Sequence, residues 1–160
     1  MAVDIFLKID GIPGESQDAK HKDEIDVLSW SWGMSTAPTA GLPTGQVPGR
    51  VSVKDMSITK RIDVATPRLM LSCASGQHLR SAALTVRKAG AKQPEFLNIK
   101  MNEVLVTSVT AAESSAEDRG TELLTLAFSK VGLDYVQQKA DGTAAGTVSF
   151  NWDLVKNVKG

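Results

Sequence analysis

The sequence has one cysteine, two histidines and no excess of either charge, and each scarcity excludes a class of protein. Because Cys73 is the only cysteine, an intramolecular disulfide framework is excluded. Eighteen basic residues balance eighteen acidic ones, which argues against a dedicated nucleic-acid or anionic-membrane binder. No stretch approaches the ~20 apolar residues of a membrane-spanning helix. We therefore expect no nucleic-acid partner and no membrane insertion.

Few side chains suited to catalysis are present. A zinc site needs three or four ligands at short spacings, whereas His21, His78 and Cys73 are far apart in the sequence. The charged segment 21–24 is typical of a solvated turn. Cys73 with His78 as its base is one alternative, although a buried structural cysteine is the commoner finding. We expect no enzyme, no cofactor, and no catalytic, cofactor-binding or metal-binding residues.

Alternation of apolar and polar residues recurs along most of the chain and predicts β-strands. The alternation predicts about seven strands, separated by turns that contain Gly, Pro or Asp. In the segment 122–136 the apolar positions change parity, so we expect a β-bulge near Ser129 and Lys130. The main apolar stripes are Val3 to Ile9, Leu97 to Leu105, Leu124 to Phe128, and Val148 to Leu154.

One segment, about 66–75, predicts a helix. Thr66 suits the N-cap, Pro67 the first turn and Gly76 the C-terminal cap. Leu69, Met70 and Cys73 would then face the sheet, which a helix this short needs for stability. Because the sequence shows no internal repeat and no sign of a second domain, we expect residues 1–160 to form a single domain.

The stretch D-V-L-S-W-S-W-G-M-S, residues 26–35, predicts a strand with two different faces. Leu28, Trp30, Trp32 and Met34 would form a core stripe, and we expect Trp30, Trp32 and Trp152 to anchor the core. The opposite face would be small and polar. It suits a wet cavity, a subunit contact or a plain solvated sheet. By alternation it comprises Ser29, Ser31, Gly33, Thr125, Ala127, Ser129, Asn98, Lys100 and Asn102.

The segment 36–50 has three prolines and three glycines and predicts neither a helix nor a central strand. A loop of this length is usually functional or disordered, so an interaction loop and a floppy hairpin tip both remain open.

Several segments, in order along nearly the whole chain, resemble the haemolysin-coregulated protein family, the tube subunit of bacterial type VI secretion systems. They are GESQDAKHKDEIDVLSWSWGMS (14–35), IDVATPRLM (62–70), LTVRKAG (84–90), EVLVTSV (103–109), EDR (117–119) and DYVQQKADG (134–142).

The resemblance implies a mainly-β fold, a two-sheet β-barrel with one flanking helix. It implies homohexameric rings that stack into a tube, with sheath and spike components and lumenal effector proteins as partners. Ser29 and Ser31 would then contact cargo in the lumen. The protein would assemble in the cytoplasm and be secreted without a signal peptide. Residues 1–5 show no basic region followed by an apolar run, which an ordinary secretory signal has. A glycan- or small-molecule-binding β-sandwich is the alternative. Ring stacking would involve Gly41, Leu42, Pro43, Thr44, Gly45, Gln46 and Val47.

Overall fold

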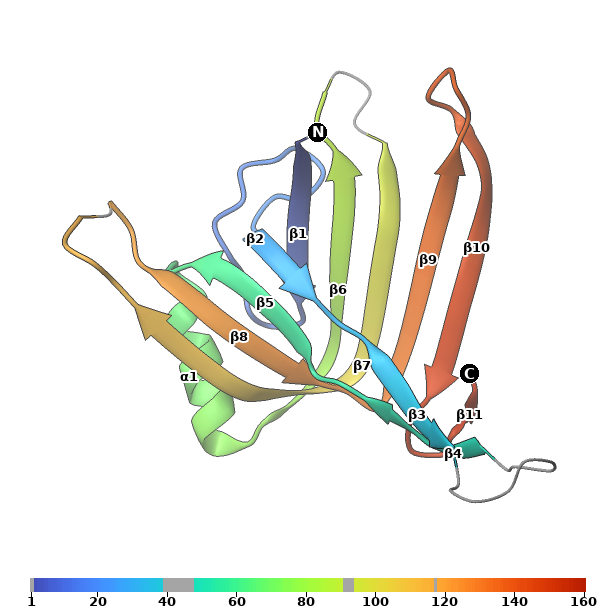
Figure 1. Cartoon of the computed structure of the whole chain (residues 1–160). Coiled ribbons are helices and arrows are strands. Elements are labelled where there is room, and N and C mark those ends of the chain that lie inside the picture. Colours follow the sequence, from blue (N-terminus) through green and yellow to red (C-terminus); the bar gives the residue numbers. More distant parts are fainter. Residues whose placement is uncertain (1, 39–47, 91–93, 117) are drawn as a thin grey trace.

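The structure, a computed structural model, describes residues 2–38, 48–90, 94–116 and 118–160. These residues form eleven strands and one helix, in the order shown in Figure 1. The elements are β1 (Val3–Ile9), β2 (Ile25–Ser31), β3 (Met34–Pro38), β4 (Pro48–Val53), β5 (Met56–Arg61), α1 (Thr66–Ser75), β6 (His78–Lys88), β7 (Glu95–Ala112), β8 (Thr121–Ala127), β9 (Lys130–Gln138), β10 (Ala144–Asp153) and β11 (Val158–Lys159).

Six of the strands close into a barrel. Their order is β7-β6-β1-β2-β5-β8, and β8 pairs back with β7. Closure is possible because β7 is long enough to serve both ends: its first half pairs with β6 and β9, and its second half pairs with β8. The fold confirms the expected mainly-β barrel with one flanking helix.

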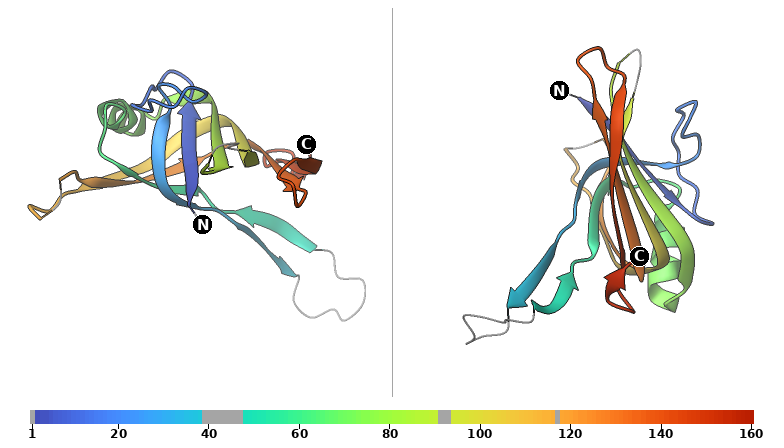
Figure 2. Two further views of the ribbon diagram at one scale, coloured as in Figure 1. Left: turned by 90° about the horizontal axis from the view of Figure 1, so that it is seen from above. Right: turned by 90° about the vertical axis from the view of Figure 1, so that its right-hand side faces the viewer.

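Three further strands extend the barrel wall and two form an arm. Beyond β7 the sheet continues through β9 and β10 to the short β11. β3 and β4 form a separate two-stranded hairpin that projects from the body, as the two views of Figure 2 show. α1 lies at one end of the molecule and the β9–β10 hairpin at the other.

The strand count exceeds the expected seven because chain reversals and breaks divide the long apolar segments. We expected a β-bulge within one strand in the segment 122–136. Instead the segment breaks at Phe128 and Ser129 into β8 and β9. The Ser129 N–H instead donates to the Asn102 carbonyl, 3.0 Å away on β7. Both strands then pair with β7, which explains why the inward parity changes at this point.

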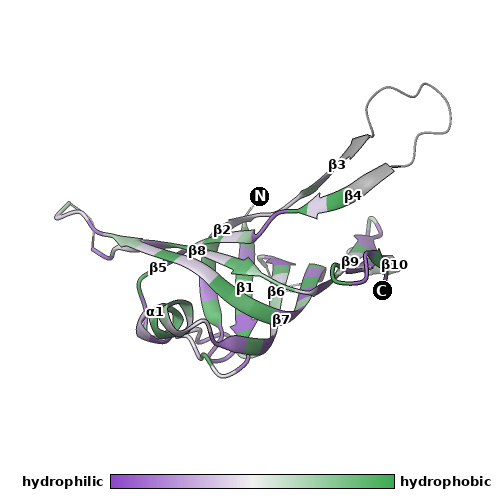
Figure 3. Ribbon diagram, turned by 90° about the horizontal axis from the view of Figure 1, so that it is seen from below, coloured by the Kyte–Doolittle hydropathy of each residue, from purple (hydrophilic) through white to green (hydrophobic). Residues whose placement is uncertain are grey.

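The barrel interior is apolar, and the alternation of hydropathy along the strands is visible in Figure 3. The expected stripe on β7 is correct up to Met101, but Val104 rather than Leu105 is buried. Glu103 has a φ of 53°, which shifts the alternation by one residue at this point. The largest fully buried apolar side chains are Leu7, Ile25, Met56, Ile58, Leu69, Leu84, Ile99, Met101, Leu124 and Leu126.

Helix α1 spans the predicted range, Thr66–Ser75, but its N-cap is Ala65. Gly76 ends it in the left-handed conformation, with φ of 67°, as expected for a C-terminal cap. Thr66 is the first helical residue rather than the N-cap, and its hydroxyl accepts the Asp63 N–H at 3.1 Å. Leu69 is buried, but Met70 is 42% exposed and does not face the barrel, contrary to expectation. Among the described residues, no helix is long and apolar enough to cross a membrane.

Candidate functional site

A β-bulge in β2 decides which side chains face outward on this side of the barrel. The β2–β5 register shifts between Val27 and Ser29, so Leu28 occupies the extra position. Before the bulge the odd residues point inward, and after it the even residues do. The expected core stripe is therefore wrong at Leu28, which is 47% exposed. It is also wrong at Met34, which is 40% exposed because it lies at the start of β3, where the arm leaves the barrel.

The bulge turns Ser29 and Ser31 outward, as expected, and register aligns them with hydroxyl side chains on the neighbouring strands. Ser31 lies opposite Ser57, which lies opposite Thr125, which in turn lies opposite Ser108. A second row runs from Ser29 through Thr59 and the exposed Leu123 to Thr110, so one large apolar side chain interrupts it. We call this set the hydroxyl surface; it consists of Ser29, Ser31, Ser57, Thr59, Thr107, Ser108, Thr110 and Thr125.

Hydrogen bonds between these side chains fix one end of the hydroxyl surface. Thr125 Oγ1 lies 2.7 Å from Thr107 Oγ1 and 2.6 Å from Ser108 Oγ. The Thr107 hydroxyl also donates to Asp55, at 2.7 Å. No member of the surface is charged, so it offers neutral donors and acceptors to whatever contacts it.

A hollow of about 360 Å³ opens beside Ser31. Its walls also include Ser57, Trp32, Gly33, Lys54 and Asp55. The indole N–H of Trp32 donates to the Lys54 carbonyl at 2.8 Å, which holds the start of the β4–β5 turn against the hollow. The hollow therefore has the hydroxyl groups of Ser31 and Ser57 on one wall, and the positive Lys54 and negative Asp55 on the other.

The three tryptophans approach the core from two places: Trp30 is on β2 and Trp32 follows it directly, whereas Trp152 is on β10. Trp30, Trp32 and Trp152 are each partly buried and pack against the buried core. The Trp32 ring meets Phe128 with centroids 6.0 Å apart. Trp30 and Trp32 therefore have their rings on the side of the core, opposite the outward Ser29 and Ser31.

The other side of the barrel is more highly charged than the sequence indicated. Lys100 and Asn102 point outward as expected, but they line a hollow of about 390 Å³ together with Lys8 and Arg80. The description of a small face with little charge therefore holds for the residues on β2 and β8, but it is wrong for Lys100 and Asn102 on β7, whose neighbours on β1 and β6 include Lys8 and Arg80.

The projecting arm corresponds to both ends of the proline- and glycine-rich segment. β3 and β4 pair from Met34 with Val53 to Pro38 with Pro48, so the ends of this segment are strands rather than loop. The expected stacking residues, Gly41 to Val47, lie outside the described residues.

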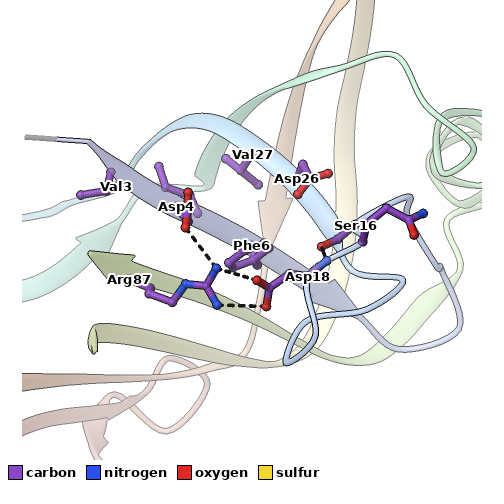
Figure 4. Close-up of a pocket in the computed structure, with 10 residues that line it drawn as sticks. Val3, Asp4, Phe6, Ser16, Asp18, Asp26, Val27 and Arg87 are labelled. Carbon is purple, nitrogen blue, oxygen red and sulfur yellow. Dashed lines mark hydrogen bonds and ion pairs between the residues drawn. The ribbon is translucent and has the colours of Figure 1, made fainter. Parts of the chain in front are cut away.

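Arg87 forms a charged cluster beside the N-terminal strand, drawn in Figure 4. Its two terminal nitrogens donate to the Asp18 carboxylate at 2.9 and 2.7 Å, and Nη2 also donates to Asp4 at 3.0 Å. The guanidinium lies 4.9 Å from the centre of the Phe6 ring. Hydrogen bonding to Arg87 lowers the pKa of Asp18 from 3.8 to about 2. With its charge already paired, Arg87 holds the loop 14–24 rather than a ligand.

The segment 21–24 is a turn with Lys22 and Asp23 exposed, as expected, but His21 is not solvated. His21 is buried, and its ring stacks on Phe6 with centroids 4.3 Å apart. Its Nδ1 lies 3.0 Å from Glu24 and its Nε2 lies 2.7 Å from Glu95 at the start of β7. This contact could not be predicted from the sequence, because Glu95 is 74 residues away from His21.

The alternative nucleophile lacks the arrangement it would need. Cys73 is partly buried on α1 and packs against the core, whereas His78 is exposed at the start of β6. Within the described residues, His, Cys, Asp and Glu side chains do not gather in any group of three suited to a metal ion.

Three comparisons place this fold among known proteins. Residues 6–135 match the model of a family described as "Type VI secretion system effector, Hcp". The chain is 50% identical to Protein hcp1 of Pseudomonas aeruginosa over 161 residues, covering 99% of both chains. It superimposes on the crystal structure of Hcp1 from Salmonella typhimurium with a TM-score of 0.80, 38% identity and 99% of each chain covered.

A further solved structure, a type six secretion system protein, matches with a TM-score of 0.93 and 30% identity, covering 99% of this chain and 100% of the other. The family match, the sequence identity and the fold thus agree over nearly the whole length. This chain belongs to the Hcp family of type VI secretion system proteins.

Proposed function

We propose that this chain is the subunit of a type VI secretion inner tube. Six copies close into a ring, the rings stack, and effector proteins travel in the lumen during contractile ejection. The sheath and spike of the secretion machine are its other partners. The subunit assembles in the cytoplasm, leaves the cell through the secretion machine and has no catalytic role.

The hydroxyl surface carries the proposal. A sheet face in bulk water normally has many Lys and Glu side chains, which keep it soluble and monomeric. Here four adjacent strands present Ser and Thr, with Ser29, Ser31 and Thr107 exposed. Small neutral side chains leave room for a cargo protein and offer hydrogen bonds to its backbone, so we place this surface in the lumen.

The alternative, a glycan-binding sandwich, would use exposed tryptophans as stacking platforms. Trp30 and Trp32 instead pack against the core, and the indole N–H of Trp32 is already engaged by Lys54. The tube subunit is therefore the better-supported function.

Ser31→Gln tests the lumenal assignment. The variant leaves the inner stripe untouched, so it should fold and form rings as the unchanged protein does. It would place six longer side chains at the hollow beside Ser31, and a lumenal effector should no longer co-purify with the rings. Ser75→Gln, at an exposed position at the end of α1, is the matched control and should retain the effector.

Co-purification of a co-expressed candidate effector is measured together with a thermal melt and light scattering. Unchanged effector binding with a lower melting temperature would mean that Ser31 meets a neighbouring subunit, which would refute the lumenal placement.

The arm provides a second test, of ring stacking. Replacing Leu42 to Val47 by a Gly-Ser linker should leave single rings intact but reduce tube formation and secretion. The same linker in place of residues 113–116, an exposed turn, is the control. Tubes seen at normal length by electron microscopy, with normal secretion, would show that the segment is only a tolerated insertion.

A further inference from the structure

His21 lies at the centre of a contact between the loop 14–24 and the start of β7. Its ring is buried and stacks on Phe6 of β1. Nδ1 lies 3.0 Å from Oε2 of Glu24, on the same loop, and Nε2 lies 2.7 Å from Oε1 of Glu95, the first residue of β7. Each ring nitrogen therefore faces a carboxyl group. We call this arrangement, His21 with Glu24 and Glu95, the histidine clasp.

The number of protons on the ring decides whether both contacts are favourable. An ionised carboxylate only accepts hydrogen bonds, and a neutral imidazole has one N–H donor and one bare nitrogen. A neutral His21 could donate to one of the two glutamates but would turn a lone pair toward the other. Only the doubly protonated ring donates to both, and each contact is then a hydrogen bond between opposite charges, which is the stronger kind.

The charged groups around the clasp also favour a cation at this place. The Asp18 carboxylate accepts the backbone N–H of His21 at 3.2 Å. On β6, Arg87 pairs with Asp18 and with Asp4 of β1. With the two clasp glutamates this makes four carboxylates against one guanidinium, so a second positive charge reduces the local excess of negative charge. The loop also has charged side chains that point into water, which are Lys20, Lys22 and Asp23.

A second contact holds the loop without depending on a histidine proton. Arg87 donates to the Asp18 carboxylate at 2.9 and 2.7 Å. Hydrogen bonding to Arg87 lowers the pKa of Asp18 to about 2, so this pair stays charged at any pH well above that value. The loop therefore has one permanent anchor at Asp18 and one at His21 that depends on protonation.

We propose that the histidine clasp is a pH-sensitive switch, in which doubly protonated His21 ties the loop 14–24 to the start of β7 and loss of one proton releases that tie. The tie is present at low pH and disappears as the pH rises, because the second hydrogen bond needs the second proton. Release takes the ring off Phe6 and uncovers the outer face of β1, while Arg87 keeps the loop attached at Asp18. The switch lies within one chain and does not depend on the ring proposed above.

Hydrogen–deuterium exchange of the whole protein tests the switch. It is measured by mass spectrometry at about pH 5.5 and about pH 8.5, on either side of the range in which histidine ordinarily changes its charge. Each rate is divided by the intrinsic rate at the same pH, so that protection can be compared. Peptides from the loop 14–24 should lose protection by roughly tenfold or more at the higher pH, because one charge-assisted hydrogen bond is lost. Peptides from β5, where every second side chain is buried, should keep theirs, which shows that the opening is local.

Glu95→Gln is the most informative variant. An amide can donate to a bare ring nitrogen as well as accept from an N–H, so the loop should stay protected at both pH values and the pH response should disappear. His21→Phe keeps an aromatic ring against Phe6 but has no donor, so loop protection should be equal at the two pH values. His78→Gln is the matched control, because His78 is exposed at the start of β6, and the pH response should remain.

Three results would overturn the switch. Equal loop protection in the unchanged protein at both pH values would mean that the loop stays closed without the second proton. A pH response that survives Glu95→Gln would place the titrating group outside the clasp, and a response that disappears in His78→Gln would assign it to the other histidine. If His21→Phe does not fold, Glu95→Gln still decides the question, since the Glu95 side chain is 39% exposed and the substitution keeps its shape.

Discussion

A buried ion pair fixes α1 to the end of the barrel, and breaking it should be costly. The side chains of Lys60 on β5 and Glu122 on β8 are fully buried, and the two residues lie opposite each other in register. The Lys60 ammonium donates to Glu122 at 3.2 Å and to Asp63 at 2.9 Å. The Thr66 hydroxyl donates to the same Glu122 carboxylate, which ties the first residue of the helix to the pair.

Lys60→Met would leave the Glu122 carboxylate buried, with only the Thr66 hydroxyl as a partner. Removing one member of a buried pair costs about 3–5 kcal/mol, because the remaining charge is neither solvated nor compensated. With a urea m-value of about 2 kcal/mol per molar, the midpoint should fall by roughly 1.5–2.5 M. Glu122→Leu should cost less, because Lys60 would keep Asp63 and the Arg61 carbonyl as acceptors.

The decisive variant is the double substitution Lys60→Met with Glu122→Leu. It removes both charges and fills the site with apolar side chains of similar volume, which is often close to neutral. It should recover at least about 2 kcal/mol of the loss caused by Lys60→Met alone, although Asp63 would still lose its cation.

Urea unfolding, followed by tryptophan fluorescence at one fixed protein concentration, measures these differences, since subunit association changes the apparent stability. Arg61→Met, at the exposed neighbouring position, is the control and should change the free energy of unfolding by less than about 0.5 kcal/mol. A double variant no more stable than Lys60→Met would refute the reasoning and attribute the loss to packing.

Two further predictions concern Trp32 and Asp18. Trp32→Ala should cost about 3 kcal/mol in urea unfolding, while Trp32→Phe should cost about 1 kcal/mol, because it keeps most of the contact and loses the hydrogen bond to the Lys54 carbonyl; equal losses would contradict this division. For Asp18, the pairing with Arg87 lowers the folded pKa to about 2, so its contribution is present above 3.8 and disappears as the pH falls toward 2. Calorimetry should therefore show the melting-temperature gap between Asp18→Asn and the unchanged protein closing over that range, and a constant gap would refute the argument.

The alternation of side chains predicted the class of fold, because a closed barrel needs one apolar face on every strand. It could not predict the positions at which the alternation shifts. The irregularities at Leu28 and Glu103 and the break at Ser129 each move the inward side by one residue, and only the partner strand determines where this happens. Leu28 was therefore misassigned, and Met34 was misassigned because the chain leaves the barrel there to form the arm, although Trp30 and Trp32 lie on the expected side.

The buried charged residues were missed for a related reason. Lys60 and Glu122 continue the apolar stripes of Ile58 and Leu124 by exact alternation. Strict use of that alternation would have placed both inside the barrel, but charged residues are so rarely buried that they are normally assigned to solvent. What reverses the assignment is their mutual pairing, since opposite charges in register can be buried together where either one alone cannot.

The net charge of zero does not reveal that charged and neutral side chains lie on different sides of the barrel. The sum correctly argues against a dedicated polyanion binder, but it says nothing of where charges lie. The hydroxyl surface is neutral, whereas Lys8, Arg80 and Lys100 gather on the other side of the barrel. If the neutral side lines the lumen, cargo is retained by hydrogen bonds and shape rather than by long-range attraction, and its binding should change little with salt. The same balance of composition would fit a uniformly mixed surface, so this property follows from strand order and register, which decide the neighbours of each side chain.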